Sequence, residues 1–207
     1  MPTRVWLLRH AETAVPTVFH GAESDIGLSE RGRRRTDALA PVLAALGPDA
    51  VVASAMKRAI LTATPVAALC GQVLRIEPAL HERRVGVLSG TPTVPEGPLW
   101  RETVTHWEAG DLEFTTNDAE SFADIQRRVI PVWERLTTEY ADRKLIVVAH
   151  GVVIRVLLLS ILPEWSPTDW RKFPSVSNLA VSELVGNDTS WRSERLCEIP
   201  ECIRSVE

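Results

Sequence analysis

Hydrophobic runs in this sequence end in residues that can bind anions or move protons. The run at 4–8 leads into Arg9 and His10, and the run at 145–149 leads into His150. In an open α/β sheet, ligands bind outside the carboxyl ends of the strands. Arginine pairs two anionic oxygens through a planar fork, and histidine titrates near neutral pH. These positions therefore predict one shared anion site.

A third run contributes another arginine. Ser54 ends the run at 50–54, and Arg58 lies about one turn into the helix predicted after it. One arginine or histidine at a strand end is more often a solvated side chain, so no single position decides the matter. Four such residues at corresponding strand ends favour a functional site.

The rest of the chain alternates strand-like and amphipathic segments, which is typical of an α/β fold. Strands are predicted over 4–8, 50–54, 73–76, 145–149 and 179–184, with a weaker edge strand over 191–196. Helices are predicted over 30–46, 57–69, 122–140 and 152–162, with Ser29 and Ser121 as N-caps and a kink at Pro131. We expect residues 1–207 to form one three-layer sandwich, with a mostly parallel central sheet flanked by helices.

Composition narrows the class of protein. The chain has 207 residues, 45% of them hydrophobic, which is enough for one sizeable core. Its 23 basic and 27 acidic residues give a net charge of -4, so neither nucleic acid nor a membrane is expected as a partner. Three cysteines without a C-x-x-C pair, and no signal-like or membrane-length run, suit a cytoplasmic protein. The five histidines lack metal-ligand spacing, so no metal is expected.

Several segments resemble, in order, the signature motifs of the histidine phosphatase superfamily, the group that includes cofactor-dependent phosphoglycerate mutases. They are LLRHAET at 7–13, SAMKRAILTA at 54–63, LHERRVGVLSG at 80–90 and VVAHGVVIR at 147–155. Weaker similarities are HGAESDIGLSERG at 20–32 and AESFADIQRRV at 119–129. Each motif alone is a weak signal, and the ordered set is a strong one.

The resemblance implies a double-displacement phosphoryl transfer that needs no cofactor. His10 matches the nucleophile that becomes phosphohistidine, and Glu82 matches the general acid and base. Arg9, Arg58 and His150 match the groups that hold the phosphoryl oxygens. The resemblance also suggests substrate contacts at Thr13, Ser54, His20, Gly21 and Gly151.

Departures from the family pattern bear on the activity. Ala11 replaces the usual glycine, which requires a negative φ, and Pro16 replaces an asparagine that helps to hold phosphate in many members. Val85 stands where the mutases have a tyrosine. We therefore expect a phosphatase that acts on a small phosphomonoester. Mutase-type transfer and a catalytically silent phosphoryl-binding or interaction module stay open as alternatives, and a homodimer is compatible with the sequence.

The segment at 91–118 is predicted to be a lid-like insertion that contacts the organic half of the substrate. Trp100 and Trp107 would supply flat apolar surface there. The segment has one basic residue, Arg101, against six acidic ones, Glu96, Glu102, Glu108, Asp111, Glu113 and Asp118. This excess predicts that substrates with additional negative charge are disfavoured.

Overall fold

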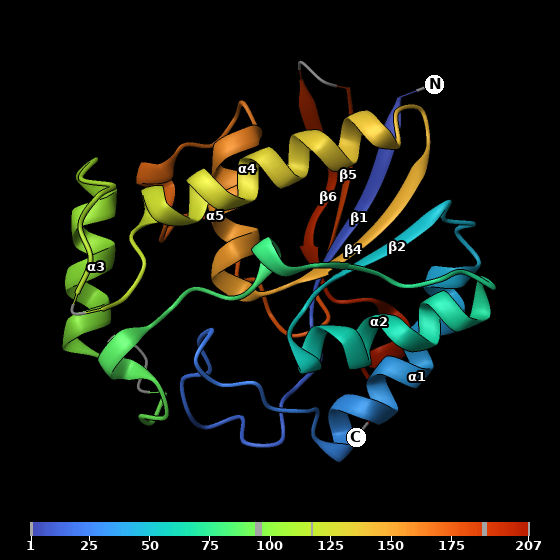
Figure 1. The fold of residues 1–207 in the computed structure, drawn as a ribbon, viewed down its shortest axis with the longest axis horizontal. Coiled ribbons are helices and arrows are strands. Elements are labelled where there is room, and N and C mark those ends of the chain that lie inside the picture. Colours follow the sequence, from blue (N-terminus) through green and yellow to red (C-terminus); the bar gives the residue numbers. More distant parts are fainter. Residues whose placement is uncertain (1, 94–96, 117, 188–189, 207) are drawn as a thin grey trace.

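A six-stranded sheet runs through the protein, as seen in a computed structural model that describes residues 2–93, 97–116, 118–187 and 190–206 (Figure 1). The strand order is β3-β2-β4-β1-β5-β6. The strands are β1 (Thr3–Arg9), β2 (Ala50–Ser54), β3 (Arg75–Glu77), β4 (Lys144–Ala149), β5 (Val181–Gly186) and β6 (Trp191–Glu198). Strands β1 to β4 are parallel to one another, whereas β5 pairs antiparallel with β1 and β6 pairs antiparallel with β5. This is the mixed, mostly parallel α/β sheet that the sequence predicts.

The central strands are hydrophobic without interruption because both faces of the sheet are covered. In β1, Val5 and Leu7 pack into one buried cluster, whereas Trp6 and Leu8 pack into another. Every residue of β2 is buried. Side chains alternate along each strand, so they pack into two separate hydrophobic layers, one on each face of the sheet.

Helices cover the two faces of the sheet. They are α1 (Glu30–Ala44), α2 (Lys57–Leu69), α3 (Pro98–Glu108), α4 (Phe122–Glu139) and α5 (Gly151–Ile161). The pair α1 and α2 lies on one face, α4 and α5 lie on the other, and α3 stands beyond one end of the sheet (Figure 1). The predicted N-caps are confirmed, since Ser29 accepts from Gly32 N and Ser121 forms a capping box with Asp124.

Several predicted boundaries were wrong, each for a local reason. The strand expected at 73–76 is β3, three residues long, and Val73 before it is 94% exposed. The strand expected at 179–184 begins at Val181, because Leu179 has φ 60° and cannot continue a ladder. Helix α3 was not predicted, although Pro98 at its first turn suits a helix start.

Two further expectations from the sequence concern the helices. Pro131 lies inside α4, which continues to Glu139, and the kink expected there remains a prediction. None of the helices in the described ranges is long and apolar enough to cross a membrane.

Candidate active site

The end of β1 is fixed by backbone and side-chain bonds on all sides. Arg9 N donates to Ala180 O at 3.2 Å and His10 N donates to Ala149 O at 3.0 Å. Asn178 Nδ2 donates to His10 O at 2.9 Å, so a loop distant in sequence holds this position. The histidine is therefore mounted on rigid backbone, as a reacting group must be.

The His10 ring has one protonated and one bare nitrogen. Nδ1 lies 2.7 Å from Ala11 O, and a carbonyl can only accept, which assigns the proton to Nδ1 and leaves Nε2 as a lone pair. Burial is the main cause that lowers the pKa of His10 well below its ordinary value, and the charges of Arg9 and Arg58 lower it further. The ring is thus neutral at neutral pH, with Nε2 unprotonated.

His150 lies against His10 and has both ring nitrogens engaged. The ring centroids are 5.1 Å apart, with the planes at 57°. Arg58 Nε donates to His150 Nδ1 at 3.3 Å, so Nε2 carries the proton and donates to Ser54 Oγ at 2.8 Å. Burial first, and then His10 and Arg58, lower the pKa of His150 well below its ordinary value. Ser54 is fully buried, so its contact with the His150 ring lies within the core.

The two arginines face the site in different ways. Arg9 Nη1 donates to Val176 O at 2.9 Å, and its buried Nε has no partner among the described residues. Arg58 is fully buried and also donates to the carbonyl oxygens of Ser24, His20 and Gly21. With the bond to His150, these contacts use four of the five guanidinium N–H groups of Arg58.

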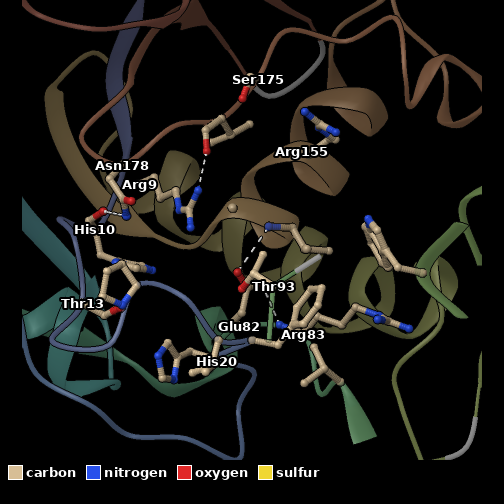
Figure 2. A pocket seen from close by; sticks show the side chains of 18 of the residues that line it. Arg9, His10, Thr13, His20, Glu82, Arg83, Thr93, Arg155, Ser175 and Asn178 are labelled. Carbon is tan, nitrogen blue, oxygen red and sulfur yellow. Dashed lines mark hydrogen bonds between the residues drawn. The ribbon is translucent and has the colours of Figure 1, made fainter. Parts of the chain in front are cut away.

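Glu82 lies at the start of α5, across the cavity from Arg9 (Figure 2). Its Oε1 accepts from Arg83 N at 2.8 Å and its Oε2 accepts from Val152 N at 3.4 Å. Glu82 belongs to the loop before Gly86, and its carboxyl faces the N-terminus of α5, where the helix dipole favours negative charge. Glu82 is only 8% exposed, which makes it an enclosed proton donor or acceptor.

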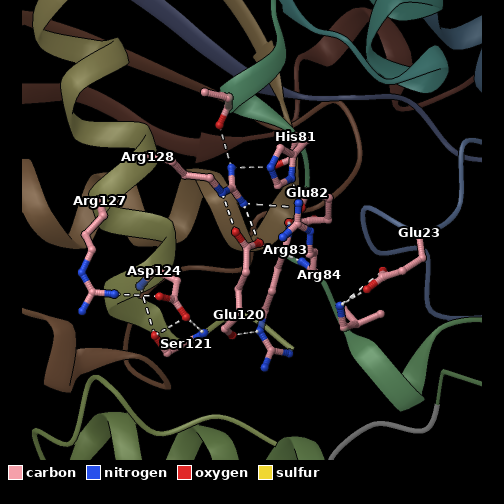
Figure 3. Close-up of polar contacts among 12 residues, drawn as sticks. Glu23, His81, Glu82, Arg83, Arg84, Glu120, Ser121, Asp124, Arg127 and Arg128 are labelled. Atoms are coloured by element: carbon pink, nitrogen blue, oxygen red, sulfur yellow. Dashed lines mark hydrogen bonds and ion pairs between the residues drawn. The ribbon is translucent and has the colours of Figure 1, made fainter. Parts of the chain in front are cut away.

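The loop that carries Glu82 is supported from behind by an ion pair. Arg128 on α4 pairs with Glu120 at 2.8 Å and donates to Ala79 O and His81 O (Figure 3). Glu120 in turn accepts from Arg84 N at 2.8 Å. This pair therefore fixes the backbone on both sides of Glu82.

The matched glycines differ in what they do. A Cβ at Gly21 would lie 2.8 Å from Arg83 O, so Gly21 is needed for backbone packing and does not line the cavity. Gly151 does line the cavity, and a Cβ there would lie 3.4 Å from Arg9 Cζ. Ala11 lies outside the positive-φ residues of the described chain, so it meets the requirement set for replacing glycine.

A comparison with family models settles the membership of the chain. The model described as histidine phosphatase superfamily (branch 1) matches residues 5–199. The chain belongs to this superfamily.

Relatives of the chain include a phosphatase and a probable mutase. The chain is 28% identical over 193 residues to a glucosyl-3-phosphoglycerate phosphatase of Mycolicibacterium vanbaalenii, covering 89% of this chain and 84% of that one. It is 28% identical over 192 residues to a probable phosphoglycerate mutase of Yersinia pestis, covering 91% and 87%. A bifunctional protein of Mycobacterium tuberculosis is 29% identical over 191 residues, which span 91% of this chain and 52% of that protein. The chain thus spans about half the length of the first curated relatives it matches.

A solved structure has the same fold over nearly the whole chain. The native structure of a mycobacterial glucosyl-3-phosphoglycerate phosphatase is 26% identical with a TM-score of 0.81, covering 95% of this chain and 99% of that one. A phosphoserine phosphatase from Entamoeba histolytica, 18% identical with a TM-score of 0.82, covers 97% and 99% and shows the fold alone.

In this member of the superfamily the site residues meet at a cavity of about 330 Å³. Of the residues predicted from sequence, Arg9, His10, Thr13, His20, Glu82 and Gly151 line it. Arg58, His150 and Ser54 lie behind His10 and contact one another. Pro16 is also in the wall, where the family pattern has an asparagine.

Sequence reasoning missed several residues of the wall. They are Arg83, Trp170, Ser175, Asn178 and, one helical turn after Gly151, Arg155. The spacing of Gly151 and Arg155 on one helix face was a usable signal. Ser175 and Asn178 come from an irregular loop between α5 and β5, and nothing in the local pattern marks them.

The described acidic residues of 91–118 give no support to the predicted repulsion of anionic substrates, which stays a prediction. Glu102, Glu108, Asp111, Glu113 and Asp118 do not line the cavity, and Glu96 lies outside the described residues. Glu108 pairs with Arg171, Asp111 with His106 and Glu113 with Arg127. Trp100 does line the cavity, whereas Trp107 is buried in the core beneath it.

Proposed function

We propose that this protein is a metal-independent phosphatase, which hydrolyses a small phosphomonoester through a phosphohistidine formed on His10. The observation that carries the proposal is the state of the His10 ring. Its Nδ1–H is held by Ala11 O, so the bare Nε2 is kept neutral beside Arg9. A phosphoryl group bound by Arg9 would therefore meet a nucleophile that is already deprotonated.

The first half-reaction moves the phosphoryl group from the substrate oxygen to His10. The Nε2 lone pair forms a bond to phosphorus while the bond from phosphorus to the ester oxygen breaks. The leaving oxygen takes a proton from Glu82, which is placed across the cavity from Arg9. Arg9 and the remaining N–H of Arg58 would balance charge on the equatorial oxygens.

The second half-reaction returns the enzyme to its starting state. Glu82, now a carboxylate, takes a proton from water as that water attacks phosphorus and the bond to Nε2 breaks. In the proposed scheme His150 also contacts the phosphoryl group, and a bond from its Nε2–H would then replace the bond to Ser54. Inorganic phosphate and the alcohol are the products.

A substrate panel tests this function against its alternatives. Purified protein would be assayed for phosphate release from sugar phosphates, phosphoserine, nucleotides and 3-phosphoglycerate, with chelator and with or without 2,3-bisphosphoglycerate. Phosphate release without a bisphosphate requirement is the expected result. Isomerisation of 3-phosphoglycerate that depends on the bisphosphate would indicate a mutase, and silence across the panel would favour a binding module.

A further inference from the structure

We propose that Arg155 forms a second anion subsite in the cavity, which binds a carboxylate on the organic half of the substrate. The inference rests on the proposed phosphatase function and names its substrate class, a phosphomonoester that also carries a carboxylate. Arg155 and Gly151 both line the cavity from the same face of α5 (Figure 2). Gly151 lies against the Arg9 guanidinium, so it marks the phosphoryl end of the cavity. Arg155 lies four residues further along the helix, a rise of about 6 Å, which suits a substrate whose two anionic groups are a few bonds apart.

The Arg155 side chain is held in place by neutral partners. Its guanidinium lies over the rings of Trp170 and Phe173, 5.0 and 5.9 Å from their centroids. Nη2 donates to Pro174 O at 3.1 Å. Within the described ranges no carboxylate forms an ion pair with Arg155. The fork is therefore oriented before ligand binding, and its charge is left for a ligand.

The cavity wall carries more positive charge than a phosphoryl group alone would neutralise. Arg9, Arg83 and Arg155 line the cavity with Glu82 as the one acidic residue among the described lining residues, and Arg58 lies directly behind. Arg9 and Arg155 line the same cavity. Burial lowers the pKa of Arg155, the Cys197 thiol opposes this shift, and the charge of Arg9 adds to it. In the proposed first half-reaction Glu82 supplies the proton of the leaving group, and the described wall holds no other acidic residue to balance these cations. A second anion on the substrate would compensate the remaining cations.

A carboxylate fits this position better than a second phosphate. Arg155 offers one planar fork, which matches the two oxygens of a carboxylate. Ser175 is another polar side chain of the wall on that side (Figure 2). The Trp170 ring, which also lines the cavity, lies against the Arg155 guanidinium. A phosphate dianion would need donors for three oxygens, as Arg9 and its neighbours provide at the other end.

The test compares two substrates that differ at one group, 3-phosphoglycerate and glycerol 3-phosphate. In the wild type kcat/KM should be roughly 10- to 100-fold higher for the acid, since a hydrogen-bonded charged pair is worth that factor. Arg155→Met keeps the apolar contact with Trp170 and should remove most of this preference. Arg155→Lys should retain part of it. Arg192→Met, an exposed arginine outside the cavity wall, should leave the preference unchanged.

Binding separates failure of this inference from failure of the proposed function. In the His10→Ala background, calorimetry should show tighter binding of 3-phosphoglycerate than of glycerol 3-phosphate, and Arg155→Met should erase the difference. An acid-to-alcohol ratio that Arg155→Met leaves unchanged, in turnover or in binding, overturns the carboxylate subsite. A greater loss for 1,3-propanediol bisphosphate than for the carboxylate would also overturn it, in favour of a second phosphate. Absence of turnover with the binding preference intact would instead reject the phosphatase.

Discussion

His10 and His150 lie ring against ring, 5.1 Å apart between centroids, and both are buried beside Arg58. Each ring is kept neutral by its surroundings, because a proton on either ring would lie close to the cations Arg9 and Arg58 and to the other imidazole. The carbonyl of Ala11 and the hydroxyl of Ser54 fix the tautomers. The proposed nucleophile and its neighbour therefore form one electrostatic unit.

This pair predicts a loss of stability in mild acid. Both histidines have a pKa well below 6.5 in the folded protein, so below pH 6.5 the unfolded chain binds more protons than the native one. The free energy of unfolding should be insensitive to these rings above about pH 6.5 and should fall as pH decreases below it. Denaturant unfolding at pH 7.5 and 5.5 measures this. A His10→Asn, His150→Asn double variant should show a smaller pH dependence than the wild type, and an equal dependence would contradict the assignment.

The proposed role of His10 as the nucleophile can be tested directly. His10→Ala should abolish phosphate release and the acid-labile phosphoenzyme, because no other described residue of the cavity wall offers a bare ring nitrogen beside Arg9. Phosphoenzyme is measured with a radiolabelled substrate after rapid quenching into alkaline denaturant, because the P–N bond of phosphohistidine survives in base and breaks in acid. His106→Asn is the matched control, since His106 is partly exposed, contacts Asp111 and is absent from the cavity wall. Turnover surviving in His10→Ala would sink the mechanism.

Glu82→Gln separates proton transfer from phosphate binding. The glutamine keeps the shape and can still accept from Arg83 N, but it cannot protonate a leaving group. Single-turnover phosphorylation should slow by roughly 100-fold or more with an alkyl phosphate and much less with an aryl phosphate, whose phenoxide leaves without a proton. Equal losses on both substrates would remove Glu82 from the role of acid.

The sequence predicted the parts of the site that lie at strand ends, and missed the parts that tertiary packing brings in. Arg9 and His10 were found because β1 reads as a buried strand and ends there. Asn178, which bonds to His10 O, could not be found in this way, because it belongs to an irregular loop. That loop turns at Leu179, a residue with φ 60°, and no local rule assigns such a conformation to leucine.

Helix α3 shows a different kind of miss. Its buried residues, Thr103, Val104 and Trp107, are spaced as on one helix face. Prolines and glycines around them favoured an irregular segment, although Pro98 is in fact compatible with a helix start. The packing of Trp107 against Phe122 and Trp170 then holds the helix on the body.

Loss of the ion pair behind Glu82 should reduce both stability and activity. Arg128→Met would leave the partly buried Glu120 carboxylate without its cation, which should cost roughly 1–3 kcal/mol. It would also release the carbonyls of Ala79 and His81 (Figure 3). Denaturant unfolding should show the loss, and the leaving-group dependence of turnover should steepen as Glu82 becomes misplaced. An Arg128→Met, Glu120→Gln double variant should lose less than the sum of the single changes.

Gly32 packs α1 against the backbone that follows β1 and the proposed nucleophile. Its replacement by alanine should lower stability even though alanine is the better helix former. A Cβ at Gly32 would lie 2.3 Å from Glu12 O, and this obstacle is backbone that cannot rotate away. Gly32→Ala should therefore lower the free energy of unfolding by roughly 1–3 kcal/mol through overpacking, in spite of the helix propensity gained. Gly27→Ala is the control, because its Cβ would meet side chains at 3.6 and 3.7 Å, which is ordinary contact. Because Glu12 follows His10 by two residues, displacement of this backbone should also lower kcat in Gly32→Ala and leave it unchanged in Gly27→Ala. Equal stability of the two variants would show that α1 can move away from the site without cost.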